Sequence, residues 1–241
     1  MSGARLALYQ DGACSNLGPV RATTAVEDYL KGVFALAVAG GVSTSAIAKA
    51  LEVSPASASS MIRRLRDAGL VDWEPGGHIE LTDDGWRTAL DIVRRHRLVE
   101  TFLHQVVGLE LWEIHDEAER MEHAVSERLV DRIDEMLGHP EVDPHGHPIP
   151  APGAARYVEP DLLDLSVVDV GVRASVEWVS DHDTPALAHL VQLGLRPGAE
   201  VEVVERAAFG GPTWVEVDGA RHALGDQLLR SVRCRVSSGS R

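Results

Sequence analysis

The chain has 241 residues, a formal net charge of −14 at pH 7 and 44% hydrophobic side chains. This length suits two or three domains rather than one small domain. No apolar run approaches the ~20 residues of a membrane-spanning helix, and no basic-then-apolar leader begins the chain, so we expect a cytoplasmic protein without membrane contact. Cys14 and Cys234 form no CxxC pair, which argues against a disulfide framework or a thiolate metal site.

The acidic excess is confined to residues 98–241, because residues 1–97 hold equal numbers of acidic and basic side chains. The net charge therefore does not exclude a nucleic-acid-binding domain in the first part of the chain. Residues 1–21 show no periodicity and are expected to form a flexible tail. Apolar residues at helical spacing then predict a helix from Thr24 to Ala39, with Thr24 and Glu27 as a capping box.

Residues 22–94 carry the pattern of a winged helix-turn-helix domain. Two further helices and a two-stranded hairpin are expected after the first helix, at residues 45–51, 56–68, 70–73 and 78–81. Ser54-Pro55 supplies a cap and a first-turn proline to the second of these helices. In this layout that helix enters the major groove of DNA and the hairpin is the wing.

The candidate DNA contacts are hydroxyl and guanidinium side chains of this recognition helix: Ser54, Ser57, Ser59, Ser60, Arg63 and Arg64. Short hydroxyl side chains can approach base edges and phosphates closely, whereas arginines suit phosphates. The alternative is a plain amphipathic helix in a protein-binding module. The hairpin at the expected place favours DNA binding.

Two helices in the middle of the chain carry His and Glu side chains at facing positions. The first, from Thr82 to about His104, carries His96 and Glu100 one turn apart. The second begins at Leu109 to Glu113 and has four such residues on one face: His115, Glu119, Glu122 and His123. Imidazole with carboxylate is a ligand set for a divalent transition metal. A solvated acidic helix face is the alternative, and two such helices in tandem favour the metal.

Residues 95–158 are expected to form a helical domain, completed by a helix from Ser126 to Leu137. Their apolar surplus exceeds what one helical layer can bury, so we expect a symmetric homodimer. A Pro-rich linker or ordered loop follows and contains His145 and His147. Both could be metal ligands, but we expect that they are not, since we identify no carboxylate partner nearby in sequence.

Residues 159–236 change to the two-residue period of strands. Four strands are expected, with a helix over residues 185–193 after the first of them, and the strands lie at residues 170–179, 200–206, 213–217 and 228–236. Short strands separated by Gly and Pro turns are typical of a small β-barrel.

Several motifs, in unbroken order, resemble the diphtheria-toxin-repressor (DtxR) family of metal-dependent transcriptional regulators. They are Glu27 to Leu30, Ser54-Pro55, Gly69 to Val71, Leu81 to Gly85, Arg95 to Leu98, His115 to Ala118, Glu122-His123 and Gly146 to Pro150. Residues 165–235 resemble the SH3-like, FeoA-type domain of the longer members. The resemblance implies an α+β fold with an N-terminal winged helix-turn-helix, a helical dimerisation and metal-binding domain, and a C-terminal small SH3-like β-barrel.

The resemblance also implies two metal sites per subunit. The primary, regulatory site would use Asp28, Glu119, Glu122 and His123, and the ancillary site His96, Glu100 and His115. The C-terminal domain of long members can donate further ligands, for which Asp181 and Asp183 are the candidates.

Iron-sensing members have Met where Asp28 stands and Cys where Glu119 stands, so the resemblance implies the Mn²⁺ branch, with Fe²⁺ as the other possible metal. Carboxylates in place of sulfur also favour the harder ion. Some manganese sensors have a second carboxylate where this chain has Lys31, so separate primary and ancillary sites are expected rather than a bridged two-metal centre.

The sequence thus predicts a Mn²⁺-dependent homodimeric regulator that binds double-stranded palindromic operator DNA and represses metal-uptake genes. It would be no enzyme and would take no small-molecule substrate. An Fe²⁺-responsive regulator of the same family is one alternative. A dimetal hydrolase is another, but no nucleophile set or Gly-rich phosphate loop accompanies the His/Glu helices. A metal-storage or protein-interaction module is the third.

Overall fold

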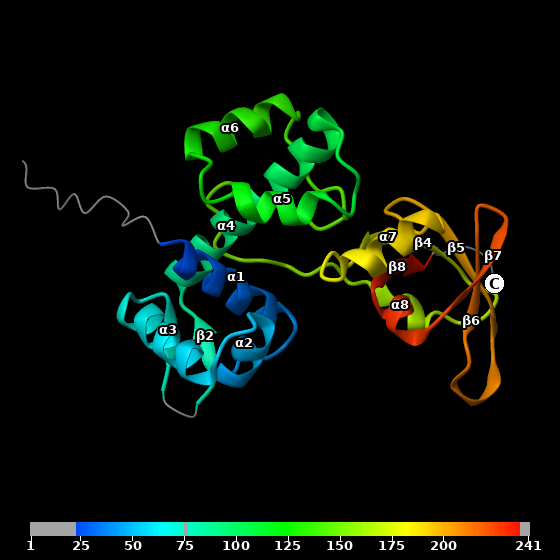
Figure 1. The fold of residues 1–241 in the computed structure, drawn as a ribbon, viewed down its shortest axis with the longest axis horizontal. Helices are drawn as coiled ribbons and strands as arrows, with labels where there is room; N and C mark the ends of the chain where they lie inside the picture. The colour runs from blue at the N-terminus through cyan, green and yellow to red at the C-terminus, as the bar shows by residue number, and fades with distance from the viewer. Residues whose placement is uncertain (1–22, 75–76, 237–241) are drawn as a thin grey trace, which may run out of the picture.

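The computed structural model describes residues 23–74 and 77–236 of the chain (Figure 1). The tail expected over residues 1–21 lies outside the described residues, as does part of the predicted wing turn. In the described ranges, no helix is long and apolar enough to cross a membrane.

The N-terminal unit has three helices and a two-stranded sheet, which confirms the winged helix-turn-helix layout. Its elements are α1 (Thr24–Val38), α2 (Thr44–Ala50), α3 (Pro55–Asp67), β1 (Val71–Trp73) and β2 (Ile79–Leu81). Ser43 and Ser54 cap α2 and α3 through their side chains, so each helix has the serine start that the sequence indicated. The strands are antiparallel, with Val71 opposite Leu81. Apolar faces of these elements meet the start of the next helix in one buried core.

The long helix α4 (Asp83–Phe102) belongs to two units at once. It begins at the cap Thr82, packs against α1, and farther along packs against the helices that follow. Gly85 lets its first turn approach the chain before β1, since an added Cβ there would lie 1.9 Å from the carbonyl oxygen of Leu70. A short π-helix, η1 (Leu103–Val107), continues α4.

Two shorter helices complete the helical unit: α5 (Ile114–Met121) and α6 (Glu127–Met136). The predicted start of α5 at residues 109–113 is wrong, because those residues form turns. Glu122 ends α5 with helical backbone angles, so the expected helix face continues to it. Apolar side chains that remain about half exposed on this unit include Val106, Val107, Leu129 and Met136. They leave apolar surface for a second copy of the chain.

The C-terminal unit is a six-stranded antiparallel sheet in the order β3-β8-β4-β5-β6-β7. Its strands are β3 (Leu163–Asp164), β4 (Arg173–Val179), β5 (Glu200–Arg206), β6 (Thr213–Val217), β7 (Ala220–Leu224) and β8 (Val232–Val236). Its helices are α7 (Thr184–Gln192) and α8 (Asp226–Arg230), with short 3₁₀ turns η2 (Leu165–Val167) and η3 (Ala208–Gly210).

The predicted β-domain is confirmed, with four differences in detail. Strands β3 and β7 were not expected, and α8 occupies the first part of the strand predicted over residues 228–236. The edge strands β3 and β7 do not pair in the described part of the chain, so the sheet is open rather than a closed barrel.

The loop after α6 fixes the C-terminal unit to the helical unit. Val179 N donates to the carbonyl oxygen of His145 at 3.0 Å. Gly146 has φ +96°, and an added Cβ there would lie 1.9 Å from the carbonyl oxygen of Glu177. The rings of His147 and Trp178 lie 4.7 Å apart. These contacts hold the end of β4 against the helical unit.

The segment between the helical unit and β3 also contacts the DNA-binding unit. The Tyr157 ring packs edge-on against Phe34 of α1, with ring centroids 5.1 Å apart. The guanidinium of Arg97 on α4 lies over the Tyr157 ring, 5.8 Å from its centroid. The segment is therefore anchored before the chain enters the sheet.

Candidate metal centre

The first group of polar side chains, here called the clamp cluster, consists of Asp28, Glu119, Glu122 and His123. Asp28 comes from α1, whereas the other three come from α5 and its end. Ligand atoms of Asp28, Glu122 and His123 lie within 4.8 Å of one another. The structure thus brings together residues from the DNA-binding unit and the helical unit.

His123 is oriented by a neighbour that the sequence did not reveal. Its Nδ1 donates to Glu27 Oε2 at 2.7 Å, and Arg95 holds the same oxygen at 3.2 Å. Nε2 of His123 then faces Asp28 Oδ1 at 3.0 Å. A carboxylate that takes the proton of one ring nitrogen leaves the other free as a metal ligand.

The predicted capping box of Thr24 and Glu27 is wrong, because the Glu27 side chain does not turn back to the helix start. Thr23 is the N-cap of α1 and makes no side-chain cap bond. Glu27 is directed to His123 and Arg95 instead, so its role depends on contacts far along the chain.

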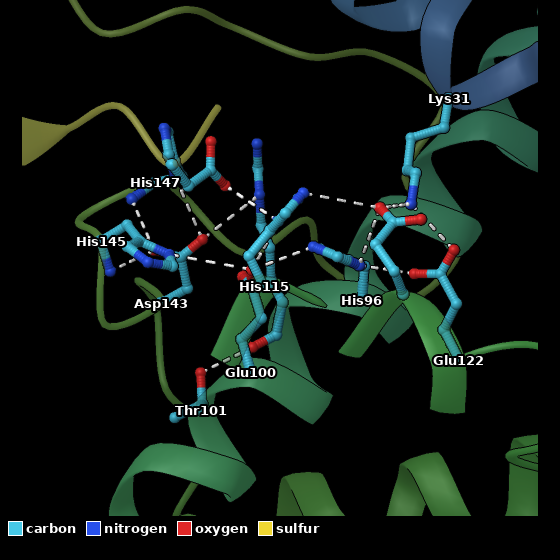
Figure 2. A network of polar contacts seen from close by, with 12 residues as sticks. Lys31, His96, Glu100, Thr101, His115, Glu122, Asp143, His145 and His147 are labelled. Atoms are coloured by element: carbon cyan, nitrogen blue, oxygen red, sulfur yellow. Dashed lines mark hydrogen bonds and ion pairs between the residues drawn. The ribbon is translucent and has the colours of Figure 1, made fainter. Parts of the chain in front are cut away.

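Lys31, one turn beyond Asp28 on α1, enters the clamp cluster as a cation. Its Nζ donates to Glu122 Oε1 at 2.8 Å (Figure 2) and also to Glu119. Burial disfavours the ammonium, but the two carboxylates outweigh this and raise the pKa of Lys31. Burial likewise disfavours the charged form of Glu122, but His96 and Lys31 outweigh it and lower the pKa of that carboxyl.

The second group, here called the core cluster, surrounds the carboxylate of Glu100. Its members are His96, Glu100, His115, His145 and Asp181, of which the four other than Asp181 are labelled in Figure 2. Glu100 Oε1 lies 3.0 Å from His96 Nε2 and 3.2 Å from His115 Nδ1. Glu100 is fully buried, and burial raises its pKa, but the surrounding imidazoles outweigh this and hold it well below its usual value.

The C-terminal unit supplies Asp181 to the core cluster. Asp181 Oδ2 lies 3.4 Å from His115 Nδ1. Burial disfavours the imidazolium, but Asp181 and Glu100 outweigh it and raise the pKa of His115 to about 10. Asp183, the other candidate, has a different role, because its Oδ1 accepts from Ala186 N at 2.9 Å and caps α7.

His145 belongs to the core cluster, contrary to expectation. It is fully buried, its Nε2 donates to the carbonyl oxygen of Leu111 at 3.0 Å, and its Nδ1 lies 3.8 Å from Glu100 Oε1. Burial disfavours its charged form, but Glu100 outweighs this and raises the pKa of His145 to about 9. The carboxylate partner comes from α4, so sequence neighbours of His145 could not show it.

His147 stays outside the core cluster. It joins Asp143 in a turn, where Asp143 Oδ1 accepts from the backbone N atoms of His145 and His147 at 2.9 Å each. The Asp143 carboxylate therefore stabilises this turn and is not a member of the core cluster.

His96 connects the two clusters. Its Nδ1 lies 2.5 Å from Glu122 Oε2 and its Nε2 lies 3.0 Å from Glu100 Oε1, so the ring spans from one cluster to the other (Figure 2). Burial disfavours its charged form, but Glu100 and Glu122 outweigh this and raise the pKa of His96 to about 9. Glu119 Oε1 also lies between the clusters, 3.8 Å from both His96 and His115.

Three atoms of these clusters are buried without a hydrogen-bond partner in the described part of the chain: Asp28 Oδ1, Glu100 Oε2 and His145 Nδ1. The contact of Asp28 Oδ1 with His123 is close but lacks hydrogen-bond geometry. Burial also raises the pKa of Asp28, against the opposing effect of His123. Buried polar atoms without partners are costly. A divalent cation would take lone pairs of the two carboxylate oxygens and, once its proton is displaced, that of His145 Nδ1. The oxygen and nitrogen donors fit such an ion.

The recognition helix presents most of the predicted DNA contacts to solvent. Ser57, Ser60, Arg63 and Arg64 are exposed, whereas Ser59 is half-buried. Ser54 is exposed but its hydroxyl accepts from Ser57 N as the α3 cap. A hollow of about 540 Å³ between α1 and α3 is lined by Tyr29, Ala56, Ser57, Ser60, Met61 and Arg64. A basic and hydroxyl-bearing helix end beside a concave surface suits a DNA backbone.

Three family profiles match consecutive parts of the chain. Residues 21–79 match the iron dependent repressor N-terminal DNA binding domain, and residues 82–151 match its metal binding and dimerisation domain. Residues 163–236 match the FeoA domain.

Known proteins resemble the chain over most of its length. The diphtheria toxin repressor of Corynebacterium glutamicum is 30% identical over 223 residues, which cover 88% of this chain and 96% of that protein. The iron-dependent repressor IdeR of Mycobacterium tuberculosis is 33% identical over 220 residues, covering 86% and 95%. A solved manganese-dependent transcriptional repressor in complex with manganese has a TM-score of 0.80 and 38% identity, covering 88% and 99%.

Proposed function

Because the chain belongs to the DtxR family of metal-dependent transcriptional repressors, we propose that Mn²⁺ is its activating metal and that it binds at two sites per subunit. The chain is a DNA-binding regulator whose partners are operator DNA and a second copy of itself. We place it in the cytoplasm, where its operator is, and assign it the repression of metal-uptake genes.

The clamp cluster is the observation that carries the proposal. It joins Asp28 of α1 to Glu122 and His123 beyond α5, and its donors are carboxylate oxygens and an imidazole nitrogen. This donor set favours Mn²⁺ over softer ions more than a set with sulfur would. The solved manganese-bound repressor that shares the fold supports the same metal.

The residues act by fixing the position of the DNA-binding unit. When bound, the ion would supply the positive charge that holds carboxylates of two units together. Asp28 then couples α1 to α5, and α1 packs against α3 and α4. Half-sites on DNA require one separation of the two recognition helices of a dimer, so a fixed α1 favours the binding-competent arrangement.

The core cluster is proposed as the second site. The ligand atoms of Glu100, His145 and Asp181 lie close together, and His115 lies beside Glu100 and Asp181. These residues would hold the ion together with His96, which the resemblance assigns to this site and which lies beside Glu100. The ligands of the core cluster join the helical unit to the C-terminal unit, so this site would fix the third unit of the protein.

Fe²⁺ remains the second candidate, since the relatives at 30–33% identity include an iron-dependent repressor. The deciding experiment is binding of a palindromic operator fragment by the full chain, titrated with Mn²⁺, Fe²⁺, Co²⁺ and Zn²⁺ at fixed ionic strength. We expect Mn²⁺ to activate binding at concentrations where Fe²⁺ does not.

Two variants accompany this titration. R64A should weaken operator binding, because one phosphate contact is lost. The slope of the logarithm of the binding constant against the logarithm of the salt concentration should become about 1 less steep. R132A, an exposed arginine of α6, is the matched control and should leave both unchanged. Activation by Fe²⁺ at lower concentration than Mn²⁺ would refute the metal assignment and leave the DNA-binding function intact.

A further inference from the structure

Lys31 occupies the place in the clamp cluster where two carboxylates converge. Its ammonium bonds Glu119 and Glu122, and it lies on the same face of α1 as Asp28, three residues earlier. One face of α1 therefore supplies a carboxylate that can bind a metal ion and an ammonium that would repel it.

We propose that the Lys31 ammonium is an internal competitor for the divalent ion: it holds the carboxylates of Glu119 and Glu122 in the metal-free protein and must leave them before the ion can bind. The inference rests on the proposed function, since it concerns the metal affinity of that same cluster. It assigns to Lys31 the role of setting the metal concentration at which the clamp closes.

Competition follows from charge and position. Glu122 Oε1 holds Nζ at 2.8 Å, and the Glu122 side chain is 1% exposed, so solvent hardly screens this pair. A divalent cation on the same oxygens would face the ammonium at close range, so the ion pairs must break first. Their free energy is subtracted from the metal-binding free energy, as for any two ligands that exclude each other.

The choice of lysine is itself informative. Lys31 and Lys49 are the only lysines among the 23 basic side chains of the chain. Lysine carries a compact charge on a flexible stem, which can withdraw from the cluster, whereas arginine presents a rigid planar fork that binds carboxylates bidentately. A withdrawable charge suits a competitor.

Lys31 also joins α1 to α5 without metal. Its removal should therefore have two effects of opposite sign: the metal-free protein loses an interdomain ion pair, and the metal gains affinity. A residue with a merely structural role would lower both stability and affinity, so the pair of measurements separates the two roles.

The test is calorimetric titration of the full chain with MnCl₂, for the parent, K31M, K31Q and K31R, together with melting temperatures with and without Mn²⁺. K49M is the matched control, because Lys49 is exposed on α2. We expect K31M to bind Mn²⁺ at the clamp cluster about tenfold or more tightly than the parent, a change of at least about 1.4 kcal/mol. Its metal-free form should melt at a lower temperature. K31R should bind Mn²⁺ more weakly than the parent, since the arginine fork holds the carboxylates bidentately and withdraws less readily.

K31M affinity equal to or weaker than that of the parent would overturn the proposal. Should K31M not fold even with Mn²⁺, K31Q serves as the neutral variant, and an unchanged or weaker Mn²⁺ affinity in K31Q would overturn the proposal instead. If the parent and D28A titrate identically, the proposed function fails rather than the role of Lys31.

Discussion

The clamp cluster and the core cluster use the same kinds of side chain in different surroundings. In the clamp cluster the carboxylates of Asp28 and Glu119 are 40% and 36% exposed, and a lysine already neutralises part of the charge. In the core cluster Glu100 is 1% exposed and is surrounded by imidazoles.

The difference concerns what each cluster can do without metal. The core cluster is a buried network of ion pairs that holds the helical and C-terminal units whether or not an ion binds. The clamp cluster is open to solvent on one side and can exchange one cation for another. Metal occupancy should therefore change the position of the DNA-binding unit more than that of the C-terminal unit.

The largest expected effect comes from the centre of the core cluster. E100Q removes the negative charge that the surrounding imidazoles share, so it should lower the free energy of unfolding by about 3–5 kcal/mol. Urea denaturation of the metal-free chain measures this. E119Q, at a half-exposed position of the clamp cluster, is the matched control and should cost less than about 1 kcal/mol. Equal losses in the two variants would contradict the contrast between the clusters.

The next effect concerns coupling rather than stability. D28A should abolish the gain in operator affinity that Mn²⁺ confers, about 5- to 150-fold for a typical coupling, while Mn²⁺ still binds the core cluster. Calorimetry and operator binding on the same protein check this. The exposed helix-start residue Asp83 supplies the control variant D83A. Full Mn²⁺-dependent operator affinity in D28A would show that the clamp does not span the units.

The pH dependence of the metal-free protein reports on the core cluster. The pKa values of His96 and His145 are raised to about 9 and that of His115 to about 10, above an ordinary value of 6.5. When the pKa is higher in the folded state, the charged imidazole contributes to the free energy of unfolding. This contribution is fully present below about pH 6.5 and is lost as the pH rises toward 9–10.

We therefore expect the melting temperature without metal to fall from pH 7 to pH 9, by about 2–4 °C for each kcal/mol lost. Differential scanning calorimetry at closely spaced pH values measures it. The slope should flatten in E100Q, whose glutamine no longer favours the charged imidazoles. A parent curve that is flat or rises over this range would exclude charged histidines in the core cluster.

The smallest effect separates two neighbouring aspartates. D183A removes the α7 cap and should cost about 1 kcal/mol without altering Mn²⁺ binding. D181N should weaken Mn²⁺ binding at the core cluster while α7 keeps its cap. Calorimetric titration of both variants decides, and loss of a bound ion in D183A would return Asp183 to the ligand set.

The sequence predicted those parts of the centre that one helix can present. Helical spacing predicted Glu119, Glu122 and His123 on one face. The structure places Glu122 and His123 just beyond α5 with ligand atoms close to Asp28, whereas the ligand atoms of Glu119 group with those of His96 and His115. Helical spacing also gave the recognition helix and its caps, since Ser54 and Pro55 act within one turn. Local patterns suffice where the partners are close in sequence.

Partners from distant elements could not be predicted in the same way. Glu27 had a local explanation as a cap, yet it orients His123, which lies 96 residues away. His145 lacked an identified carboxylate partner because that partner is Glu100 of α4. The family resemblance suggested Asp181, but only the packing of β4 against the loop after α6 brings it to His115. The spacing of residues along the chain does not indicate which faces of distant helices and strands pack together.

The anchoring of Tyr157 against Phe34 has a consequence for limited proteolysis. A cut on the C-terminal side of Tyr157, followed by separation of the sheet domain, would leave a fragment whose aromatic contact with α1 is complete. A cut before Ala154 would also remove Tyr157 and expose Phe34 and Trp86, which pack edge-on beneath it. Two fragments that differ by only a few residues should therefore differ in solubility, with the shorter one prone to aggregate through the uncovered rings.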